Sequence, residues 1–430
     1  MSEPKATTAE YLIIGNSAAA IGAVEAIREV DKIKPITMVC EEPYPAYSRP
    51  LISKYLAGER NIDGILFRPA DFYLQNSIDL LTGVKVKHLD VITKIAYLEG
   101  DELISWRRLL LATGGIPIVP KLDGGDKEGV FTFLTLKDAI AISEYLKNGL
   151  QAVVIGGGLI GISVAEALTK RGVSVTVVEM KDRILNTILD ETASSIAEKV
   201  YTKAGVKFIT NHTVRKIVGN TRTEGVVLDD GAKIPCHLVV IAIGVQPRVE
   251  LATAAGIKVN RGIVVDRFMC TSHPDVYAAG DVAEGYDFVF GTNRLTPIWP
   301  NAYSGGRIAG LNMAGTKIQY PGGTAMNSLN YFGLDIAAAG VVTPPADKSC
   351  EIMSQQTDVA YKKLVLSDDT IIGIVFVGDI ERAGIIHGLM RDRINVAGFK
   401  QALLADNFGL AYLPAELRQK RLAAATADRK

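Results

Sequence analysis

A stretch near the middle of the chain combines three glycines at a spacing that suits the binding of nucleotide phosphates. It has the sequence AVVIGGGLIGISVAEAL and contains Gly156, Gly158 and Gly161. The first glycine permits a tight turn, the second lets the backbone approach a pyrophosphate, and the third lets a helix pack close to a strand. Amide groups at the start of that helix then offer hydrogen bonds and partial positive charge to the phosphates. The stretch therefore predicts a dinucleotide site, with Leu159 and Ile160 opening the helix.

An earlier stretch repeats this pattern with small residues in place of two glycines. It has the sequence YLIIGNSAAAIGAVEAI, in which only the first of the three places holds a glycine. Small side chains at the other two places still permit the backbone to approach a ligand closely. We therefore predict a second dinucleotide site at this turn. Its candidate residues are Gly15, Ser17, Ala18, Ala19 and Ala20.

Each stretch is followed by a second apolar segment that ends in an acid. Glu41 lies 26 residues after Gly15, and Glu179 lies 23 residues after the first glycine of the other turn. Two βαβ units of about 30 residues, each with an acid about 20 residues downstream, are typical of two dinucleotide-binding domains. A carboxylate at this place accepts hydrogen bonds from a ribose 2′,3′-diol and repels a 2′-phosphate. We therefore predict NADH rather than NADPH at Glu179, although a lysine and an arginine follow it closely.

The composition limits the classes of partner. The 430 residues include 47 lysines and arginines and 47 aspartates and glutamates, so the formal net charge is zero. This balance disfavours nucleic acid or an anionic membrane as the main partner. The longest apolar runs, at 238–245 and 371–378, are far too short to span a membrane. The N-terminal sequence is polar and has no signal-peptide core, so we predict a cytoplasmic protein.

Neither cysteine nor histidine spacing predicts a metal site. The four cysteines are widely separated, and none of their spacings suits zinc, an iron–sulfur cluster or a CxxC redox pair. We therefore predict buried structural thiols, no metal, and no role for the histidines. The cysteines are Cys40, Cys236, Cys270 and Cys350, and the histidines are His88, His212, His237, His273 and His387.

With both nucleotide units in place, the chain to about residue 400 resembles the FAD-dependent pyridine-nucleotide oxidoreductases. It is most similar to the rubredoxin-, ferredoxin- and nitrite-reductase branch. The matching motifs on the FAD side are IIGNSAAA, YSRPLISKYLAG, VKVKHLD, ATGG and VYAAGDVAE. The resemblance implies that Glu41 binds the adenosine ribose of FAD, Asp281 its ribityl chain, and the backbone of Val86 its adenine. It implies further FAD contacts at Arg49, Lys54, Ala112, Thr113, Gly114 and Gly280.

The remaining motifs continue the resemblance. The three-glycine unit with Glu179 is similar to the NADH unit of the family, and IAIGVQP, which contains Gly244, is similar to its closing strand. IWPNAYSGGRIAG resembles the segment that places a tryptophan, here Trp299, against the isoalloxazine ring. The resemblance therefore implies FAD and NAD(H) as cofactors.

The repeated units and the resemblance together predict an α/β fold. Two Rossmann-like dinucleotide-binding domains, with the FAD domain interrupted by the NAD domain, precede a C-terminal α+β domain. The predicted boundaries are 1–115 and 245–325 for the FAD domain, 116–244 for the NAD(H) domain, 326–405 for the C-terminal domain and 406–430 for a tail. In relatives the C-terminal domain often forms a dimer interface, so a homodimer and a hetero-oligomer both stay open.

Two departures from the family pattern bear on the chemistry. Thiol-using relatives carry a cysteine in the loop after the first acid, but this chain has no cysteine from 41 to 235. Relatives also have Gly-Leu-Glu in the second unit, and that glutamate pairs with the loop lysine. Ser163 stands at its place here. Glu166, one turn further along the same helix face, is the acid predicted to pair with Lys54.

Hydride transfer between nicotinamide and flavin needs stacked rings and a tuned flavin, but no protein nucleophile. Lys54 is the candidate cation beside flavin N1 or N5, and Trp299 is the candidate cover of a ring face. The catalytic candidates are therefore Lys54, Glu166 and Trp299. Without a thiol, electrons must leave directly from the reduced flavin. An iron–sulfur protein, rubredoxin, a quinone-like molecule and dioxygen stay open as acceptors.

The leading hypothesis is an NAD(H)- and FAD-dependent electron-transfer oxidoreductase that works with an iron–sulfur partner. The chain end, HGLMRDRINVAGFKQALLADNFGLAYLP, resembles the tails of flavoprotein subunits in anaerobic 2-oxoacid dehydrogenase complexes such as phenylglyoxylate dehydrogenase. One version of the hypothesis is therefore a subunit of such a complex. The alternatives are a free-standing NADH oxidase or peroxidase, a rubredoxin or ferredoxin reductase, and a non-enzymatic flavoprotein that serves as an interaction module.

Overall fold

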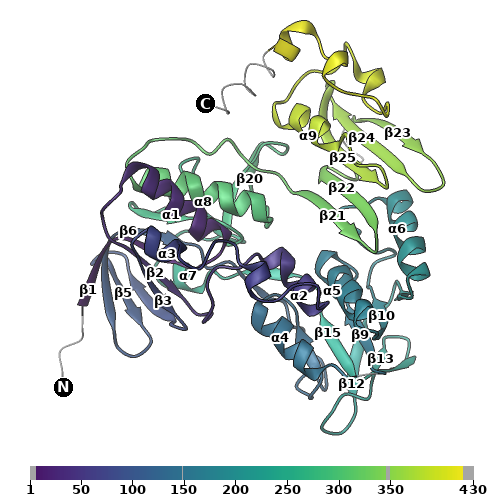
Figure 1. The fold of residues 1–430 in the computed structure, drawn as a ribbon, viewed down its shortest axis with the longest axis horizontal. Coiled ribbons are helices and arrows are strands. Elements are labelled where there is room, and N and C mark those ends of the chain that lie inside the picture. Colours follow the sequence, from purple (N-terminus) through teal and green to yellow (C-terminus); the bar gives the residue numbers. More distant parts are fainter. Residues whose placement is uncertain (1–5, 148, 345–348, 420–430) are drawn as a thin grey trace. The chain divides into compact units, whose positions relative to one another are not determined.

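The chain forms two compact units (Figure 1). The computed structural model describes residues 6–147, 149–344 and 349–419. The first unit contains Met1–Met180 and His212–Ala325, and the second contains Lys181–Asn211 and Met326–Lys430. Both units combine helices with β-sheets, so the predicted α/β fold class with a C-terminal α+β region is confirmed. The boundaries of the separate nucleotide-binding domains stay a prediction.

The largest sheet of the first unit positions the single-glycine turn. β1 pairs in parallel with β2 on one side and with β6 on the other, so the turn after β1 comes at the carboxyl edge of these strands. Ligands of open parallel sheets bind at this edge. The strand order is β3 (Ile78–Thr82), β2 (Ile36–Cys40), β1 (Ala6–Ile14), β6 (Leu103–Leu111), β5 (Ile95–Leu98) and β4 (Val86–Asp90), with β18 (Val276–Ala278) beside β6.

Two helices of the first unit, α1 (Ala18–Val30) and α8 (Trp299–Met313), lie side by side (Figure 1). α1 is buried along most of its length. The close contact requires glycine on α8, because a Cβ on Gly306 would lie only 2.0 Å from the carbonyl oxygen of Ala19. The packing therefore fixes the start of α8 relative to the turn that precedes α1.

A second parallel sheet in the first unit positions the three-glycine turn. β9 pairs in parallel with β10 and with β15, and β15 pairs with β8. β15 is buried throughout, as expected for a strand covered on both faces. The strands of this sheet that belong to the first unit are β10 (Ser174–Val178), β9 (Gln151–Ile155), β15 (Leu238–Ile241) and β8 (Val130–Thr132), and the helices are α4 (Leu136–Tyr145) and α5 (Leu159–Lys170).

Shorter elements complete the first unit. β7 and β16 form an antiparallel pair. β7 follows β6 of the largest sheet, and β16 lies where the chain returns toward β18 of the same sheet. The strands are β7 (Gly115–Pro117) with β16 (Val245–Pro247), β12 (Val214–Val218) with β13 (Gly225–Leu228) and β14 (Lys233–Pro235), and β17 (Ile263–Val264) with β19 (Ala283–Asp287) and β20 (Thr292–Leu295). The short helices are α2 (Ile52–Leu56), α3 (Phe72–Gln75) and α7 (Glu250–Ala254).

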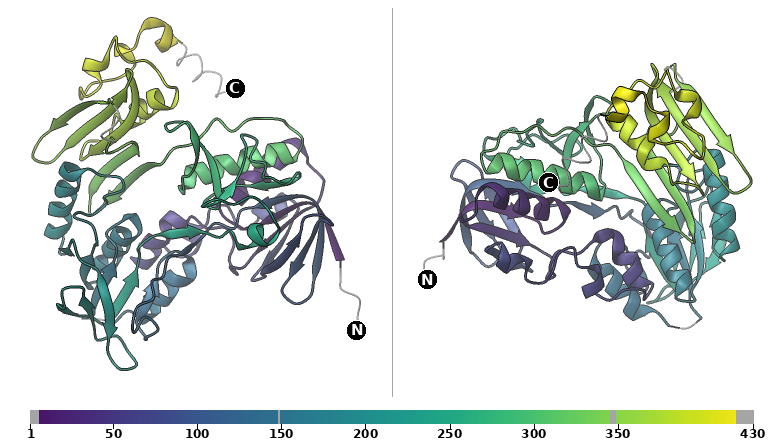
Figure 2. Two further views of the ribbon diagram at one scale, coloured as in Figure 1. Left: turned by 180° about the vertical axis from the view of Figure 1, so that it is seen from behind. Right: turned by 45° about the horizontal axis from the view of Figure 1, so that its top comes forward.

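The second unit contains an antiparallel sheet, drawn in yellow-green in Figure 2. Helices α9 (Ala383–Arg391) and α6 (Glu191–Lys203) both pack against β25, and the short strand β11 (Lys207–Ile209) follows α6. The strand order of the sheet is β21 (Met326–Tyr331), β22 (Leu334–Gly340), β25 (Thr370–Val377), β24 (Tyr361–Ser367) and β23 (Glu351–Gln356).

The side chain of Asp190 joins α6 to this sheet. Its Oδ1 accepts a 3.0 Å hydrogen bond from the amide of Ala193 and so caps the helix. Its Oδ2 accepts from the hydroxyl of Tyr361 at 2.9 Å and from Nζ of Lys363 at 2.8 Å. The Lys363 side chain is only 9% exposed. A buried ion pair therefore holds the start of α6 on the sheet.

The helices of the described ranges are short. The longest, α8, has 15 residues. No helix in the described part of the chain is long and apolar enough to cross a membrane. The predicted C-terminal tail ends in residues 420–430, which lie outside the described residues.

Candidate active site

The three-glycine turn has tight backbone contacts at two of its glycines and open space at the other. A Cβ on Gly156 would lie 2.5 Å from the carbonyl oxygen of Ala242, and one on Gly161 would lie 1.9 Å from that of Gly156. A Cβ on Gly158 would meet no atom within 4 Å. Gly158 is also the N-cap of α5 and makes no side-chain capping bond. The turn therefore combines open space with helix amide groups, which suits a pyrophosphate.

The acid that follows this turn lies against it. Glu179 is only 8% exposed, and its Oε2 accepts a 2.6 Å hydrogen bond from the amide of Gly157. This bond holds the carboxylate beside the turn, which is the placement that a ribose-binding acid needs. Gly244, which follows the neighbouring strand β15, has a φ of 130° and accepts a hydrogen bond from the amide of Ile118.

The first turn is equally tight despite its single glycine. Gly15 has a φ of 125°, and a Cβ there would lie 2.1 Å from the carbonyl oxygen of Ala112. Ser17 precedes α1 and makes no side-chain capping bond to it. The amides of the first helical turn, at Ala18–Ala20, are therefore not blocked by a cap and can meet a phosphate.

Glu41, the acid after the first turn, is held by an arginine that the sequence analysis did not single out. Nη1 of Arg248 lies 2.8 Å from Oε2 of Glu41. The backbone of Arg248 is fixed by the ATGG turn, because its amide donates to the carbonyl of Gly114 and its carbonyl accepts from the hydroxyl of Thr113. Arg248 directly follows IAIGVQP in the sequence. That position is the only sequence signal that could have indicated it.

The loop after Glu41 is organised by its neighbour, Glu42. The hydroxyl of Tyr47 donates to Oε2 of Glu42 at 2.6 Å, and Nη2 of Arg49 lies 2.7 Å from Oε1. Arg49 also donates to the carbonyl of Leu134, and the hydroxyl of Tyr47 accepts from the amide of Leu136. Burial raises the pKa of Tyr47, so its hydroxyl stays protonated. These bonds fasten the predicted flavin loop to the start of α4.

Asp281 offers a carboxylate to a ligand at the start of α1. Burial raises the pKa of Asp281, and the nearby cation of Arg49 opposes this effect. Within the described residues, no donor reaches the carboxylate. Gly280, just before it, has a φ of 81°, and a Cβ there would lie 3.2 Å from the Cβ of Ala19 at the start of α1. A partly buried acceptor beside this helix start suits the hydroxyl groups of a ribityl chain.

These observations test whether the two implied cofactors fit the chain. The open space at Gly158 and the bonded acid Glu179 fit NAD(H), and the tight turn at Gly15 with the acceptor of Asp281 fits FAD. Val86 is 4% exposed and belongs to the core of the first unit, so its backbone is the part that can meet a ligand. All predicted site residues lie in the first unit.

Lys54 lies near two acids. Its Nζ is 3.3 Å from Oε2 of Glu59 and 3.9 Å from Oε2 of Glu166. The structure thus brings together the lysine and the acid that the sequence analysis paired, and it adds Glu59. Ser163, at the place of the glutamate in relatives, uses its hydroxyl to donate to the carbonyl of Ile160 in its own helix.

Trp299 begins α8 and is partly exposed. Its ring packs edge-on against Phe67, with centroids 4.9 Å apart and planes at 84°. Phe67 also makes an edge contact with Tyr303, and the guanidinium of Arg68 lies 4.2 Å from the Phe67 centroid. Sequence reasoning missed Phe67, because it lies in a loop without periodicity. Its ring orients the indole of Trp299.

The cysteines of the described chain are free thiols; Cys40 and Cys236 are buried, whereas the prediction of burial is wrong for Cys270 and Cys350, which are partly exposed. Cys40 is buried and donates to the carbonyl of Glu42, and burial raises its pKa to about 11. Burial also raises the pKa of Cys236 to about 12. Since the thiolate is the reactive form, neither cysteine is reactive at neutral pH.

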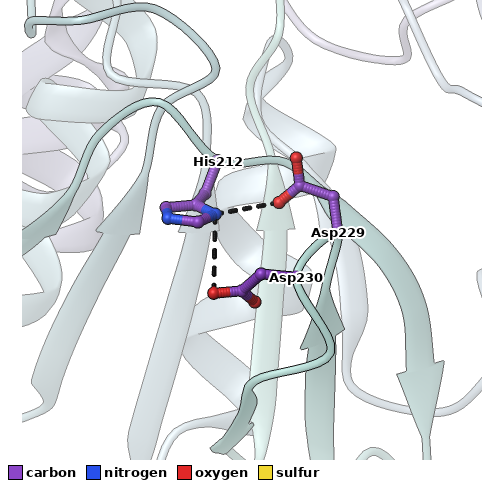
Figure 3. A group of neighbouring side chains, drawn as sticks. All are labelled: His212, Asp229 and Asp230. Carbon is purple, nitrogen blue, oxygen red and sulfur yellow. Dashed lines mark hydrogen bonds and ion pairs between the residues drawn. The ribbon is translucent and has the colours of Figure 1, made fainter.

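A histidine and two aspartates form a cluster on the surface of the first unit (Figure 3). Nδ1 of His212 lies 2.9 Å from Asp229 Oδ1 and 3.9 Å from Asp230 Oδ2. The hydrogen bond from His212 holds the pKa of Asp229 below its usual value. The amide of Thr213 donates to the same oxygen. The cluster ties the turn after β13 to the segment before β12, and we assign it no metal.

Comparison with known proteins gives two family matches. The pyridine nucleotide-disulphide oxidoreductase family matches residues 9–306, and the C-terminal domain of rubredoxin NAD⁺ reductase matches residues 326–394. The chain is 31% identical to the NAD(P)H nitrite reductase of Bacillus subtilis (strain 168), over 90% of this chain and 48% of that protein.

Two further relatives are matched over nearly their whole length. The NADH-dependent phenylglyoxylate dehydrogenase subunit epsilon of Aromatoleum evansii is 29% identical, over 92% of this chain and 95% of that subunit. Putidaredoxin reductase, in the crystal structure of its covalent complex with putidaredoxin, is 25% identical with a TM-score of 0.84. That match covers 98% of this chain and 99% of that one.

The chain spans about half the length of the Bacillus subtilis relatives that it matches. The first family match alone covers well over half of the chain, and it confirms the resemblance predicted from the sequence. The chain therefore belongs to the pyridine nucleotide-disulphide oxidoreductases, a family of FAD- and NAD(H)-dependent enzymes, and carries a C-terminal domain of the rubredoxin reductase type.

Proposed function

We propose that this chain exchanges hydride between NAD(H) and FAD and passes electrons to, or takes them from, an iron–sulfur partner protein. The absence of a thiol from the flavin loop carries this proposal. The loop at 41–58 holds no cysteine, and Cys40, just before it, is buried with a pKa raised to about 11. Without a thiolate beside the flavin, electrons pass directly between the flavin and an external protein.

Two sets of residues would hold the cofactors. Both sets combine a glycine or small-residue turn, a helix start and an acid. The FAD set is Gly15, Ser17, Ala18, Ala19, Ala20, Glu41, Arg49, Lys54, Val86, Ala112, Thr113, Gly114, Gly280, Asp281 and Trp299. The NAD(H) set is Gly156, Gly158, Leu159, Ile160, Gly161, Glu179 and Gly244.

Three side chains would act beside the reacting rings. FAD, when bound, supplies the hydride-accepting ring and can release the electrons one at a time. Lys54 would place a positive charge beside that ring and favour its reduced, anionic form. Glu166 would hold Lys54, since the two side chains lie 3.9 Å apart. Trp299 would cover one ring face, in the orientation fixed by its edge contact with Phe67.

The proposed partner is an iron–sulfur protein or other subunits of a dehydrogenase complex, in the cytoplasm. The match to phenylglyoxylate dehydrogenase subunit epsilon supports a complex, because it extends over 95% of that subunit. The match to putidaredoxin reductase supports a separate partner, because that protein was solved bound to putidaredoxin. The chain's own cysteines show no cluster-binding spacing, so an iron–sulfur centre would have to lie on the partner.

The test is anaerobic stopped-flow reduction of the FAD-loaded protein by NADH, followed by mixing with an oxidised ferredoxin or rubredoxin. We expect NADH to bleach the flavin rapidly and the iron–sulfur protein to reoxidise it. A disulfide such as cystine and air-saturated buffer serve as competing acceptors, and both should reoxidise the flavin much more slowly.

Other outcomes of this experiment would contradict the proposal. Rapid NADH-driven oxygen uptake by the isolated chain would identify a free-standing oxidase instead. Failure of NADH to bleach the bound flavin would favour a flavoprotein that serves in interaction rather than catalysis.

A further inference from the structure

Lys54 belongs to a network of alternating charges between the α2 region and α5. Two lysines and two glutamates take part: Lys54, Glu59, Glu166 and Lys170. Nζ of Lys54 lies 3.3 Å from Glu59 Oε2 and 3.9 Å from Glu166 Oε2. Nζ of Lys170 lies 2.6 Å from Glu59 Oε1 and 3.0 Å from Glu166 Oε1. Each glutamate therefore gives one oxygen to each lysine.

The network is anchored on its Glu166 side. The side chain of Glu166 is 5% exposed, whereas those of Lys54, Glu59 and Lys170 are 32%, 39% and 38% exposed. The hydrogen bond from Lys170 lowers the pKa of Glu59. Burial acts to lower the pKa of Lys170, but its hydrogen bonds to Glu59 and Glu166 outweigh this and raise it. These two groups therefore keep their charges across neutral pH.

The backbone holds the four side chains in place. The amides of Glu59 and Arg60 both donate to the carbonyl of Lys54, so the chain folds back directly after α2. Arg171, the residue after Lys170, donates through Nη1 to the carbonyl of Leu56. The end of α5 is thus bonded to the end of α2 by backbone-directed contacts as well as by the charges.

We propose that Lys170 and Glu59 are positioning residues that set the electrostatic effect of Lys54 on the flavin. This inference rests on the proposed function, in which Lys54 lies beside the flavin ring. Lys170 occupies one oxygen of each glutamate and so limits how strongly the two acids can draw Lys54 toward themselves. The four formal charges sum to zero, so loss of any one member leaves the network with a net charge.

The two positioning residues have opposite predicted effects. Replacing Lys170 with methionine leaves a net negative network and frees both acids to attract Lys54, which disfavours the reduced, anionic flavin. Replacing Glu59 with glutamine leaves a net positive network and favours the reduced flavin. A purely structural role would not separate the two variants by sign, because loss of either partner loosens the same contacts.

The experiment measures the flavin reduction potential of the FAD-loaded protein by equilibration with a reference dye. Relative to wild type, we expect Lys170→Met to lower the potential and Glu59→Gln to raise it. Lys170→Arg, which keeps the positive charge, should leave the potential at the wild-type value. Lys54→Met is the positive control and should give the lowest potential. Lys216→Met is the matched charge control, since Lys216 forms an exposed 2.7 Å ion pair with Asp123 elsewhere in the unit.

Each outcome separates this inference from the proposed function. A lower potential in Lys54→Met with no change in Lys170→Met and Glu59→Gln overturns the positioning role and leaves the proposed function intact. An unchanged potential in Lys54→Met means that Lys54 is not beside the ring, which overturns both. Shifts of equal sign in Lys170→Met and Glu59→Gln also overturn the inference, because they indicate loosened structure. FAD content and circular dichroism establish that each variant is folded.

Discussion

The guanidinium of Arg248 lies 2.8 Å from the carboxylate of Glu41, which follows the first glycine turn by 26 residues. The backbone of Arg248 is bonded to Thr113 and Gly114, so its side chain extends from a fixed point. The Arg248 and Glu41 side chains are 35% and 42% exposed. An ion pair this exposed adds little to folding stability. We therefore infer that it orients the carboxylate.

We expect Glu41→Gln and Arg248→Met each to weaken FAD binding about tenfold, because a charged hydrogen bond contributes roughly 1.5–3 kcal/mol. Arg248→Lys should fall between Arg248→Met and wild type. Titration of the apoprotein with FAD, followed by quenching of flavin fluorescence, measures the affinity. Thermal unfolding of the apoprotein should be unchanged. A lower melting temperature together with unchanged FAD affinity would assign the pair to stability instead.

Two glycines of the three-glycine turn should respond differently to alanine. A Cβ on Gly161 would lie 1.9 Å from a backbone oxygen, so Gly161→Ala should destabilise the protein by about 1–3 kcal/mol. A Cβ on Gly158 meets no protein atom within 4 Å, so Gly158→Ala should fold normally and instead weaken NADH binding. Thermal unfolding and the NADH dependence of flavin reduction separate the two effects. Normal NADH binding by Gly158→Ala would contradict the prediction that the pyrophosphate of NADH binds at this turn.

Glu179→Arg should shift the preference from NADH toward NADPH. The carboxylate is held beside the turn by the amide of Gly157, where it would accept from ribose hydroxyls and repel a 2′-phosphate. We expect the rate constant for NADH at low concentration to fall at least about tenfold, a change of about 1.4 kcal/mol. Glu144→Arg, which changes an exposed acid on α4, is the matched control. Equal NADH kinetics in wild type and Glu179→Arg would contradict the assignment.

The stability of the second unit should depend on pH through Asp190. Burial acts to raise the pKa of this carboxyl, but hydrogen bonds from Lys363, the Ala193 amide and Tyr361 outweigh it and lower the pKa. A carboxyl with a lowered pKa in the folded state stabilises fully above its unfolded value, about 4, and loses that effect as the pH falls through the folded value. We therefore expect the melting temperature to decrease as the pH is lowered below about 4.

Asp190→Asn should remove this pH-dependent contribution and destabilise the protein at pH 7 by roughly 3 kcal/mol, because Lys363 is left buried without its partner. Asp182→Asn is the control in the same segment, since its side chain is 63% exposed. Thermal unfolding of the three proteins between about pH 3 and pH 7 tests this. Parallel pH profiles for wild type and Asp190→Asn would rule out the assigned role.

The positions of the glycine turns and of the acids could be predicted from the sequence because they depend on local geometry. Spacing alone fixes which residues begin a helix after a strand, and Gly15 and Gly156 indeed form the tight contacts that such turns need. The pairing of Lys54 with Glu166 was also predictable, since helical periodicity places Glu166 on the face of Ser163.

Contacts between segments far apart in the chain could not be predicted from the sequence. Arg248 meets Glu41 only because β16 returns beside the ATGG turn, and Lys170 meets Glu59 only because α2 packs on α5. Likewise, nothing in the sequence indicates that Asp190 accepts a hydrogen bond from Tyr361, which lies 171 residues later. Such contacts depend on packing, for which one sequence carries no periodic signal.

The burial of Cys40 has a practical consequence for the cell that makes this protein. Iodoacetamide, arsenite and hydrogen peroxide attack thiolates, and a thiol whose pKa is raised to about 11 offers almost none at physiological pH. In a cell under oxidative or electrophilic stress, Cys40 would therefore stay unmodified while cysteines with a low pKa react.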